Sequence, residues 1–331
     1  MSVFSVSAQN AEIKRAQILV FLAALALSGA ARADALEDRF DTVWESLWTQ
    51  TGMPTFVVRW RDEIRVRFTG SEAPGHRDYA FQALREVTQA AGIALRDVSA
   101  EENAAEIANL DFQLLGQDEL SQEEFPREMM CRTQLQRLRQ SLLEKVVIQA
   151  RERRIVFCAH HEVMHAMGIR GHPTGNTVLR YFAARPHDGL MPMDVLMLKA
   201  WYSPRMKAGA TPFEALQVMT DAVIEATVEE RNRDAARKAQ ALFLRKTLQE
   251  MERYARGEGE VPPTVLRSGW ATEKAMLAGQ DLMAYCVGVA HLFGIGTAAD
   301  RAQARPWFER AAEKGNPGAK VMLERVFKAA P

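Results

Sequence analysis

The chain has 331 residues, enough for two domains that each bury a core. Hydrophobic residues make up 47% of it and charged residues 25%, which is ordinary for a soluble globular protein. The 42 basic side chains balance the 42 acidic ones and form no basic stripe, so the electrostatic signature of a nucleic-acid-binding protein is missing. We therefore expect no nucleic-acid partner.

The first 33 residues have the three parts of a secretory signal peptide. Lys14 and Arg15 precede an apolar run over residues 18–27, and residues 31–33 read Ala-Arg-Ala, a typical cleavage pattern. We expect cleavage after Ala33 and a mature protein outside the cytoplasm, most simply in a bacterial periplasm. The alternative is an uncleaved anchor, but the apolar run is short for a membrane span. The sequence contains no second membrane segment, so we expect no stable span after cleavage.

Helical and strand patterns alternate along the following hundred residues. Apolar side chains at helical spacing predict an amphipathic segment over residues 34–50 and a helix over residues 76–91. Residues 129–143 are predicted to be partly helical. Clusters of branched and aromatic residues predict short strands over residues 55–60, 64–69, 93–98, 110–115 and 146–149.

A helix predicted over residues 155–167, with Gly168 as its C-cap, carries the most informative motif. His161-Glu162-Val163-Met164-His165 reads H-E-x-x-H. Histidines four apart share one face of a helix, so both imidazoles can reach one Zn²⁺ ion. The glutamate between them stands beside a metal-bound water as general base. The motif predicts zinc as the cofactor, His161 and His165 as ligands and Glu162 as the catalytic residue.

The third zinc ligand should follow this helix. The extended motif resembles that of the metzincin zinc peptidases, H-E-x-x-H-x-x-G-x-x-H. Gly168 is in register with it, but Gly171 stands at the eleventh position and His172 comes one residue later. A flexible Gly171 could absorb this offset. His172 is the predicted ligand, with His187 or Asp188 in its place if the turn points His172 away.

The alternative is a helix whose histidines only cap, pair or face solvent. A bare H-E-x-x-H arises by chance in about one chain in a hundred of this length. Histidine is scarce in this chain, yet five of the seven histidines lie in one short region, as His160, His161, His165, His172 and His187. This clustering favours the zinc site.

The three cysteines suit an oxidising compartment. A disulfide between Cys131 and Cys158 is the preferred pairing, because it would tie the segment before a strand to the helix that carries His161. Closing that loop could contribute about 3 to 4 kcal/mol. Three buried free thiols are the alternative, and the sequence does not decide the pairing.

Loops and helices follow the motif. Residues 173–188 are rich in Gly, Pro, Asn and Thr and are predicted to form a long loop over the site. A helix is predicted over residues 195–202, and a longer one opens at Thr211 and runs with interruptions to Tyr254. Residues 257–263 form the clearest linker.

The last part of the chain shows a repeat-like pattern. Gly279 and Gly315 lie 36 residues apart, a period typical of paired-helix solenoids. The stretch 279–323 resembles a Sel-1-like repeat, a relative of tetratricopeptide helical hairpins. Residues 292–297 stand at that family's Gly-x-Gly turn, and residues 304–316 match its second helix, where Pro306 would shift the helix start. The resemblance implies a partner-binding surface and no catalysis.

Residues from about 57 to 219 resemble DUF 2927, a bacterial family of secreted proteins of unknown function. The resemblance rests on Cys158-Ala159-His160-His161-Glu162 with Ala166-Met167-Gly168, and on residues 190–215, which contain Asp194 and Trp201-Tyr202. In that family a glutamate and a glutamine usually stand at the positions of His161 and His165. The chain would then belong to a branch that keeps metal, or have a metzincin-like fold that is mostly non-catalytic.

Residues 190–202 are also similar to the metzincin stretch after the zinc helix. There a methionine forms an apolar floor beneath the metal, and Met191 or Met193 could serve. The alternative is that these methionines only fill the core. By the same analogy, Tyr181 or Tyr202 could stabilise an oxyanion.

These patterns predict an α+β protein, in which a metzincin-like zinc-peptidase domain precedes an α-helical Sel-1/TPR-like region. The domain would contain a small mixed sheet and the active-site helix. The predicted parts are a signal peptide over residues 1–33, the DUF 2927 metzincin-like domain over 34–219, a long charged helix and linker over 220–262, and the Sel-1-like region over 263–331.

The predicted function is that of a secreted, periplasmic zinc-dependent metallopeptidase. It would hydrolyse peptide bonds with a metal-bound water and with Glu162 as general base. Its partners would be a peptide or protein substrate and a protein at the Sel-1-like region. The alternative is a non-catalytic periplasmic adaptor that uses the Sel-1-like helices to bind proteins. The substrate, the specificity and the oligomeric state stay open.

Overall fold

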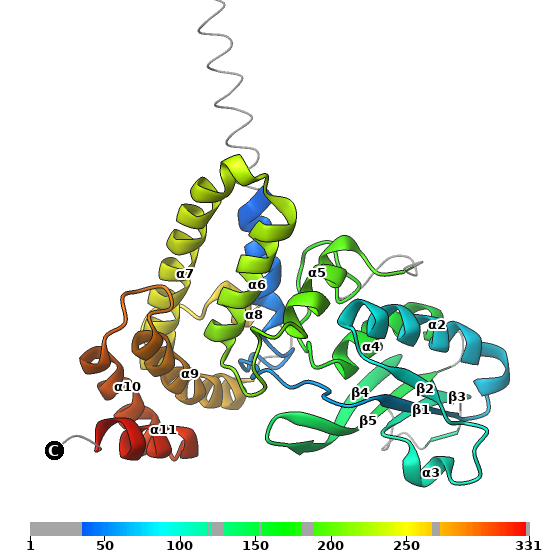
Figure 1. Ribbon diagram of the computed structural model, residues 1–331. Coiled ribbons are helices and arrows are strands. Elements are labelled where there is room, and N and C mark those ends of the chain that lie inside the picture. Colours follow the sequence, from blue (N-terminus) through cyan, green and yellow to red (C-terminus); the bar gives the residue numbers. More distant parts are fainter. Residues whose placement is uncertain are drawn as a thin grey trace, which may run out of the picture.

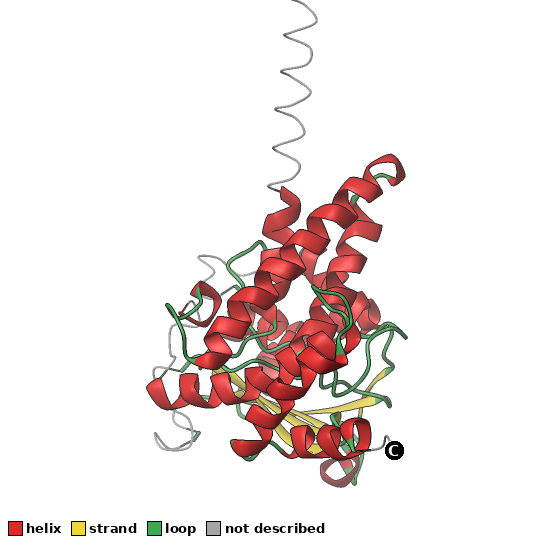
Figure 2. Ribbon diagram, turned by 90° about the vertical axis from the view of Figure 1, so that its left-hand side faces the viewer, coloured by secondary structure: helices red, strands yellow, loops and turns green. Residues whose placement is uncertain are grey.

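The computed structural model describes residues 35–117, 119–120, 129–151, 154–180, 189–266 and 272–328. The predicted signal peptide lies outside these residues. The predicted α+β class is confirmed: a five-stranded mixed sheet with its helices precedes a helical region (Figure 1). In the view turned by 90°, the strands lie in the lower half of the protein among helices, and the upper half is helical (Figure 2).

The sheet has the strand order β2-β1-β3-β5-β4. Its first four strands in this order run parallel, and β4 pairs with β5 in the antiparallel direction and forms one edge. Long crossovers, such as the one through α2 (Ala73–Ala91), allow parallel neighbours. The strands are β1 (Ile64–Thr69), β2 (Leu95–Asp97), β3 (Leu110–Leu115), β4 (Cys131–Arg139) and β5 (Leu142–Arg151).

The predicted strand over residues 55–60 is wrong. These residues are extended but make only scattered contacts: the Val57 N–H donates to Ala210 at 2.9 Å, and Arg59 forms an isolated bridge with Leu142. The branched and aromatic side chains of this segment are buried or half-buried without pairing in the sheet. Trp60 is 1% exposed, and its Nε1 donates to the carbonyl of Ala166. The segment therefore contacts the end of the motif helix and adds no strand to the sheet.

The helical prediction for residues 129–143 is also wrong, because β4 and the start of β5 occupy this stretch. Its glutamines, arginines and leucines favour helix locally, but pairing with β5 overrides that preference. Gln140 and Ser141 both have positive φ, 50° and 64°, as a two-residue turn between antiparallel strands requires. The sequence lacks the Asn-Gly signal that would have revealed this hairpin.

A disulfide between Cys131 and Cys158 joins β4 to α4 (Ile155–Ala166), with a Cα–Cα distance of 6.1 Å. The preferred pairing is thus confirmed, and Cys286 is a buried free thiol. The bond fixes the edge strand of the sheet to the helix three residues before His161. Edge strand and motif helix therefore keep a constant relative position.

Replacing Cys131 and Cys158 together by alanine is expected to lower the free energy of unfolding by about 3.5 kcal/mol, the chain-entropy value for a loop of this length. The two cysteines are 27 residues apart. Urea denaturation of oxidised protein measures the change. The parent should lose the same stability when dithiothreitol is added, and the variant should not respond. Equal midpoints for oxidised parent and variant would contradict the prediction.

The helices predicted after the motif are present in the structure. The long interrupted helix is α6 (Pro212–Thr227) and α7 (Arg233–Arg256), and α5 (Pro192–Trp201) precedes them. Thr211 and Glu214 cap α6 reciprocally, with the Thr211 N–H and the Glu214 carboxylate 2.8 Å apart. The remaining helices are α8 (Pro263–Leu266), α9 (Glu273–Phe293), α10 (Arg301–Glu313) and α11 (Pro317–Met322).

α9 and α10 form the predicted helical pair. Gly294 and Gly296, with φ of 74° and 73°, make the turn between them. α10 begins at Arg301 behind an Asp300 cap, so Pro306 lies inside the helix and does not shift its start. Among the described helices, α9 alone is long and apolar enough to cross a membrane, and half of its apolar window is buried inside the protein.

One hydrophobic core runs through the sheet region and the helical region. A helix over residues 35–46, drawn in blue beside α6 and α7 in Figure 1, links the two. The rings of Phe40 and Phe243 lie 5.4 Å apart, and those of Trp44 and Phe213 stack at 5.6 Å. The predicted domain boundaries at residues 219 and 262 stay predictions.

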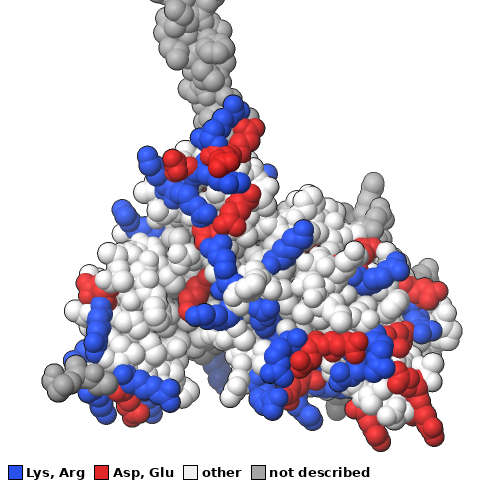
Figure 3. All heavy atoms as spheres, in the orientation of Figure 1, with Lys and Arg blue, Asp and Glu red and all other residues white. Residues whose placement is uncertain are grey.

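Figure 3 shows acidic and basic side chains interspersed on the viewed face.

Candidate metal centre

The motif helix α4 packs against β4, β5 and α2, with its apolar side in the core. Ile155, Ala159 and Val163 are fully buried, and His161 and His165 lie on an adjoining face. Met167 caps the helix, and Gly168, the predicted cap, follows it with φ of 99°. A Cβ at Gly168 would approach the Val58 carbonyl oxygen to 2.1 Å, so only glycine fits this close turn.

The structure brings His161, His165 and His172 together. The Nε2 atom of His161 lies 3.0 Å from that of His165 and 3.2 Å from that of His172, and the third pair is also 3.2 Å apart. Nitrogens about 2.0 to 2.1 Å from a tetrahedral zinc ion are separated by about 3.3 to 3.4 Å. The three atoms are thus close to the spacing that one metal ion needs, and the group could hold one.

The tautomers of two of these rings are fixed by backbone carbonyls. His161 Nδ1 lies 3.0 Å from the oxygen of Val178, and His165 Nδ1 lies 2.7 Å from the oxygen of Ile169. A carbonyl oxygen only accepts, so each Nδ1 carries the proton and each Nε2 of a neutral ring carries a lone pair. Two lone pairs that face each other at 3.0 Å repel, whereas a shared cation turns both into ligands.

Burial keeps the rings of His165 and His172 neutral. It lowers the pKa of His165 well below its ordinary value, with smaller contributions from His161 and His172. Burial, and then the charge of His161, lower the pKa of His172 to about 3. Neutral imidazole is the form that binds a metal. The donor set therefore fits zinc: three imidazole nitrogens, two of them on rings oriented by carbonyl groups in the manner usual for zinc ligands.

Glu162 lies next to the triad in sequence, and its side chain is buried, with 4% of the residue exposed. The Thr133 hydroxyl donates to its Oε2 atom at 2.7 Å. Burial raises the pKa of the Glu162 carboxyl to about 7, against a smaller lowering by this hydrogen bond. A carboxyl group that titrates near neutral pH suits proton transfer. Thr133 belongs to β4, so the edge strand of the sheet adjoins the predicted general base.

This raised pKa predicts a pH effect on the metal-free protein. A carboxyl whose folded-state pKa lies near 7, against 4.5 ordinarily, contributes stability below pH 4.5 that is lost as the pH rises through 7. We compare the free energy of unfolding of metal-free Glu162→Gln with that of the metal-free parent. The variant should gain about 3 kcal/mol on the parent between pH 4.5 and pH 8. Denaturation in the presence of a chelator at both pH values tests it. A pH-independent difference would contradict it.

The offset of the third histidine is accommodated by a tight contact and not by flexibility. The Gly171 N–H donates to the Ser46 carbonyl at 3.0 Å. A Cβ at Gly171 would lie 2.3 Å from the backbone oxygen of Glu45. The chain thus passes against the end of the helix over residues 35–46, and this contact directs His172 toward the other two rings.

Gly171→Ala is expected to weaken Zn²⁺ binding by about tenfold or more although it removes no ligand, because the backbone bearing His172 must move. Competition with a chromophoric chelator measures the affinity. Gly75→Ala is the matched control, since a Cβ there meets nothing within 4 Å. Parent-like affinity in Gly171→Ala would show that His172 is not a ligand or that the loop adapts without cost.

The other predicted site residues do not join the triad within the described residues. Tyr181 and the alternative ligands His187 and Asp188 lie outside the described residues. The Tyr202 hydroxyl is buried, donates to Met167 at 2.9 Å and accepts from the Trp60 N–H, so it is a core group that cannot stabilise an oxyanion. Met191 and Met193 pack against the core, and the methionine floor stays a prediction. Thr133 was missed, because only tertiary pairing brings it to Glu162.

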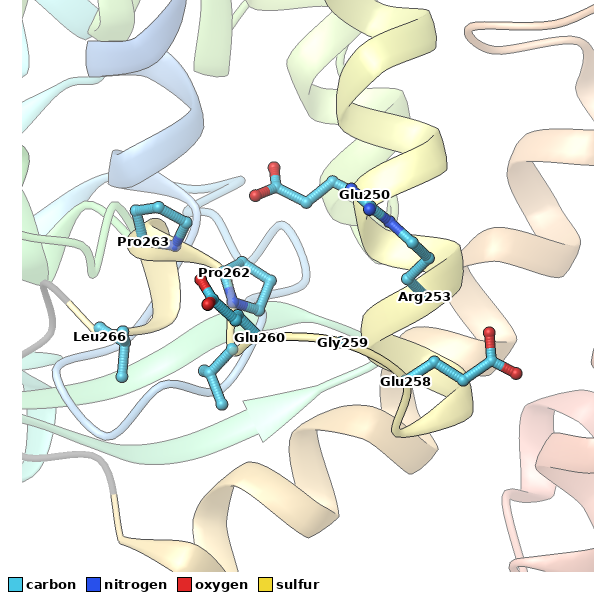
Figure 4. Close-up of a pocket in the computed structure, with 9 residues that line it drawn as sticks. Glu250, Arg253, Glu258, Gly259, Glu260, Pro262, Pro263 and Leu266 are labelled. Atoms are coloured by element: carbon cyan, nitrogen blue, oxygen red, sulfur yellow. The ribbon is translucent and has the colours of Figure 1, made fainter.

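A cavity of about 560 Å³ lies elsewhere, between α7 and the segment that follows it (Figure 4). Its lining contains three glutamates and one arginine but no histidine or cysteine. The lining residues are Glu250, Arg253, Glu258, Gly259, Glu260, Val261, Pro262, Pro263 and Leu266.

Comparison with known proteins yields one match. A family model described as "Protein of unknown function (DUF2927)" matches residues 36–221, a stretch that contains all three histidines, Glu162 and both cysteines of the disulfide. No curated protein and no solved structure matches the chain.

Proposed function

This chain belongs to the DUF2927 family, whose function is unknown, and we propose that it is a secreted zinc-dependent metallopeptidase. The observation that carries the proposal is the convergence of three imidazole Nε2 atoms within 3.0 to 3.2 Å, two of them with their proton held on Nδ1 by a carbonyl group. His161, His165 and His172 would hold the metal. The metzincin-like character of the fold is part of the proposal.

Zinc with three protein ligands and an open position supplies a Lewis acid that polarises a carbonyl and acidifies water. The chain's own contribution is proton transfer by Glu162. Its Oε2 accepts from Thr133, so the carboxyl is held in one orientation while Oε1, which makes no hydrogen bond to the described residues, is left for the proton. Glu162 would take a proton from the attacking water and give it to the leaving amine, so that the carboxylate is restored.

The edge strand supports a peptide as substrate. Among the described strands, β4 pairs with β5 alone, which leaves its outer backbone groups able to pair with an extended peptide. Thr133 lies on this strand and contacts Glu162, and the disulfide fixes the strand to α4. A peptide paired with β4 would thus run beside the general base. The disulfide also accords with the proposed oxidising, extracytoplasmic location.

Elemental analysis of the periplasmic protein tests the proposal. The protein is purified without a histidine tag, which would itself bind metal. About one zinc per chain, removable by a chelator without unfolding, is expected, together with cleavage of a peptide library that stops with the chelator and returns with Zn²⁺. Absence of zinc would overturn the proposal. Zinc whose removal unfolds the protein would indicate a structural site instead.

The helical region favours a second role as an adaptor. α9 and α10 pack as a hairpin with Gly294 and Gly296 in the turn, a turn that the resemblance to Sel-1-like repeats predicts, and Phe293 at the end of α9 is 61% exposed. In this alternative the protein would bind a protein partner through these helices and cleave nothing. Pull-down with the parent and with Phe293→Ser, together with the library assay, separates the two roles.

A further inference from the structure

The segment over residues 171–180, which we call the ligand loop, serves the metal centre twice. It carries His172, and the carbonyl of Val178 fixes the Nδ1 proton of His161. The position of His172 and the orientation of the His161 ring therefore depend on where this loop lies. The loop contains no helix or strand to hold it in place.

Glu45 holds the first half of the ligand loop. This residue is 6% exposed and lies on the helix over residues 35–46. Its Oε2 accepts from the Thr174 N–H at 2.6 Å and from the Thr174 hydroxyl at 2.9 Å. The attachment lies two residues after His172, on the same helix end that Gly171 contacts.

Asp194 holds the second half. It is fully buried in the first turn of α5. Its carboxylate accepts from the Val178 N–H at 3.0 Å, from the Met191 N–H at 2.9 Å and from the Thr177 hydroxyl. Val178 is thus bonded on both sides, with its N–H to Asp194 and its carbonyl to His161.

We propose that Glu45 and Asp194 are positioning residues of the metal centre, which set the ligand loop so that His172 and the Val178 carbonyl meet His161. The inference rests on the proposed metal site. Burying a carboxylate is unfavourable unless hydrogen bonds satisfy it. Both carboxylates accept hydrogen bonds from this loop, and Asp194 also caps α5 through the Met191 N–H. Both carboxylates bond backbone groups of the loop, so each acts on the metal centre through the loop.

Two readouts test the proposal. Zn²⁺ affinity, measured by chelator competition, is expected to fall by about ten- to a hundredfold in Glu45→Ala and in Asp194→Asn, the range for loss of a ligand's outer partner. Amide hydrogen exchange of the metal-free protein is expected to accelerate about tenfold in peptides that cover residues 172–180 and to change little in α4.

Asp111→Asn is the matched control. Asp111 is a carboxylate of similar burial, 7% exposed, but it pairs with Arg67 and Lys145 within the sheet. This variant should lose stability and keep both the Zn²⁺ affinity and the loop exchange of the parent. An Asp111→Asn variant that loses as much affinity as the other two would overturn the proposal, because general destabilisation would then explain the loss.

The two readouts separate this inference from the proposed function. A parent that binds no zinc refutes the metal site, and loop exchange then still decides the role of the two carboxylates. Unchanged exchange in both variants overturns the inference whatever the metal content. Faster exchange with parent-like affinity overturns it as well, because the loop would then not set the ligands.

Discussion

His165→Asn is expected to lower the Zn²⁺ affinity by more than about a hundredfold, since loss of only an outer partner of a ligand costs ten- to a hundredfold. Asparagine places an amide nitrogen where His165 has Nδ1, so the bond to the Ile169 carbonyl can persist. It has no atom in place of Nε2, which lies 3.0 Å from that of His161. The substitution thus removes the ligand atom and spares its support.

The measurement is competition with a chelator, supported by thermal unfolding. Saturating Zn²⁺ at about a thousand times its dissociation constant adds about 4 kcal/mol to the parent's stability, and His165→Asn should lose most of this gain. His160→Gln is the control on the same helix. His160 is buried in α4, bonds Glu86 at 2.9 Å and takes no part in the triad. Parent-like affinity in His165→Asn would refute the three-histidine site.

Glu162→Gln is expected to reduce peptide cleavage by about a hundred- to ten-thousandfold while zinc stays bound, the usual range for loss of a general base. Glutamine has the same shape and can still accept from the Thr133 hydroxyl, so the local packing should survive. It cannot take up a proton. The variant therefore separates proton transfer from metal binding and from folding.

The assay compares parent and variant on a peptide identified from the library, with zinc content measured on the same samples. Thr133→Ser, which keeps the hydroxyl, should stay near the parent rate, and Thr133→Val should show an intermediate loss. A Glu162→Gln protein with one zinc per chain and undiminished cleavage would remove Glu162 from the mechanism. If the variant lost its zinc, its rate would say nothing about proton transfer. That result would contradict the expectation that zinc binding does not depend on the Glu162 carboxyl.

The parts of the site that the sequence predicts are those set by local geometry. His161 and His165 are four residues apart on one helix, and helical period alone puts them on one face. His172 follows within a short turn, so the motif could indicate it even with the one-residue offset. The disulfide could be preferred, but not decided, from the compartment and the spacing.

The parts that the sequence does not predict depend on contacts between distant segments. Thr133 is 29 residues from Glu162, and Glu45 is 129 residues from Thr174. A buried glutamate and a solvated one look alike in a helical pattern of charged and apolar residues. The stretch that became β4 contains good helix formers, and only its partner strand decides its conformation.

The continuous core has a consequence for dissecting this protein. The family match ends at residue 221, inside α6, which runs to Thr227. A fragment cut there would strip Phe40 of its ring partner Phe243 and leave that flank of the first helix facing water. Because the same helix anchors Gly171, shortening the chain at its far end would disturb the histidine cluster indirectly. The end of the family match therefore does not coincide with the end of the packed core.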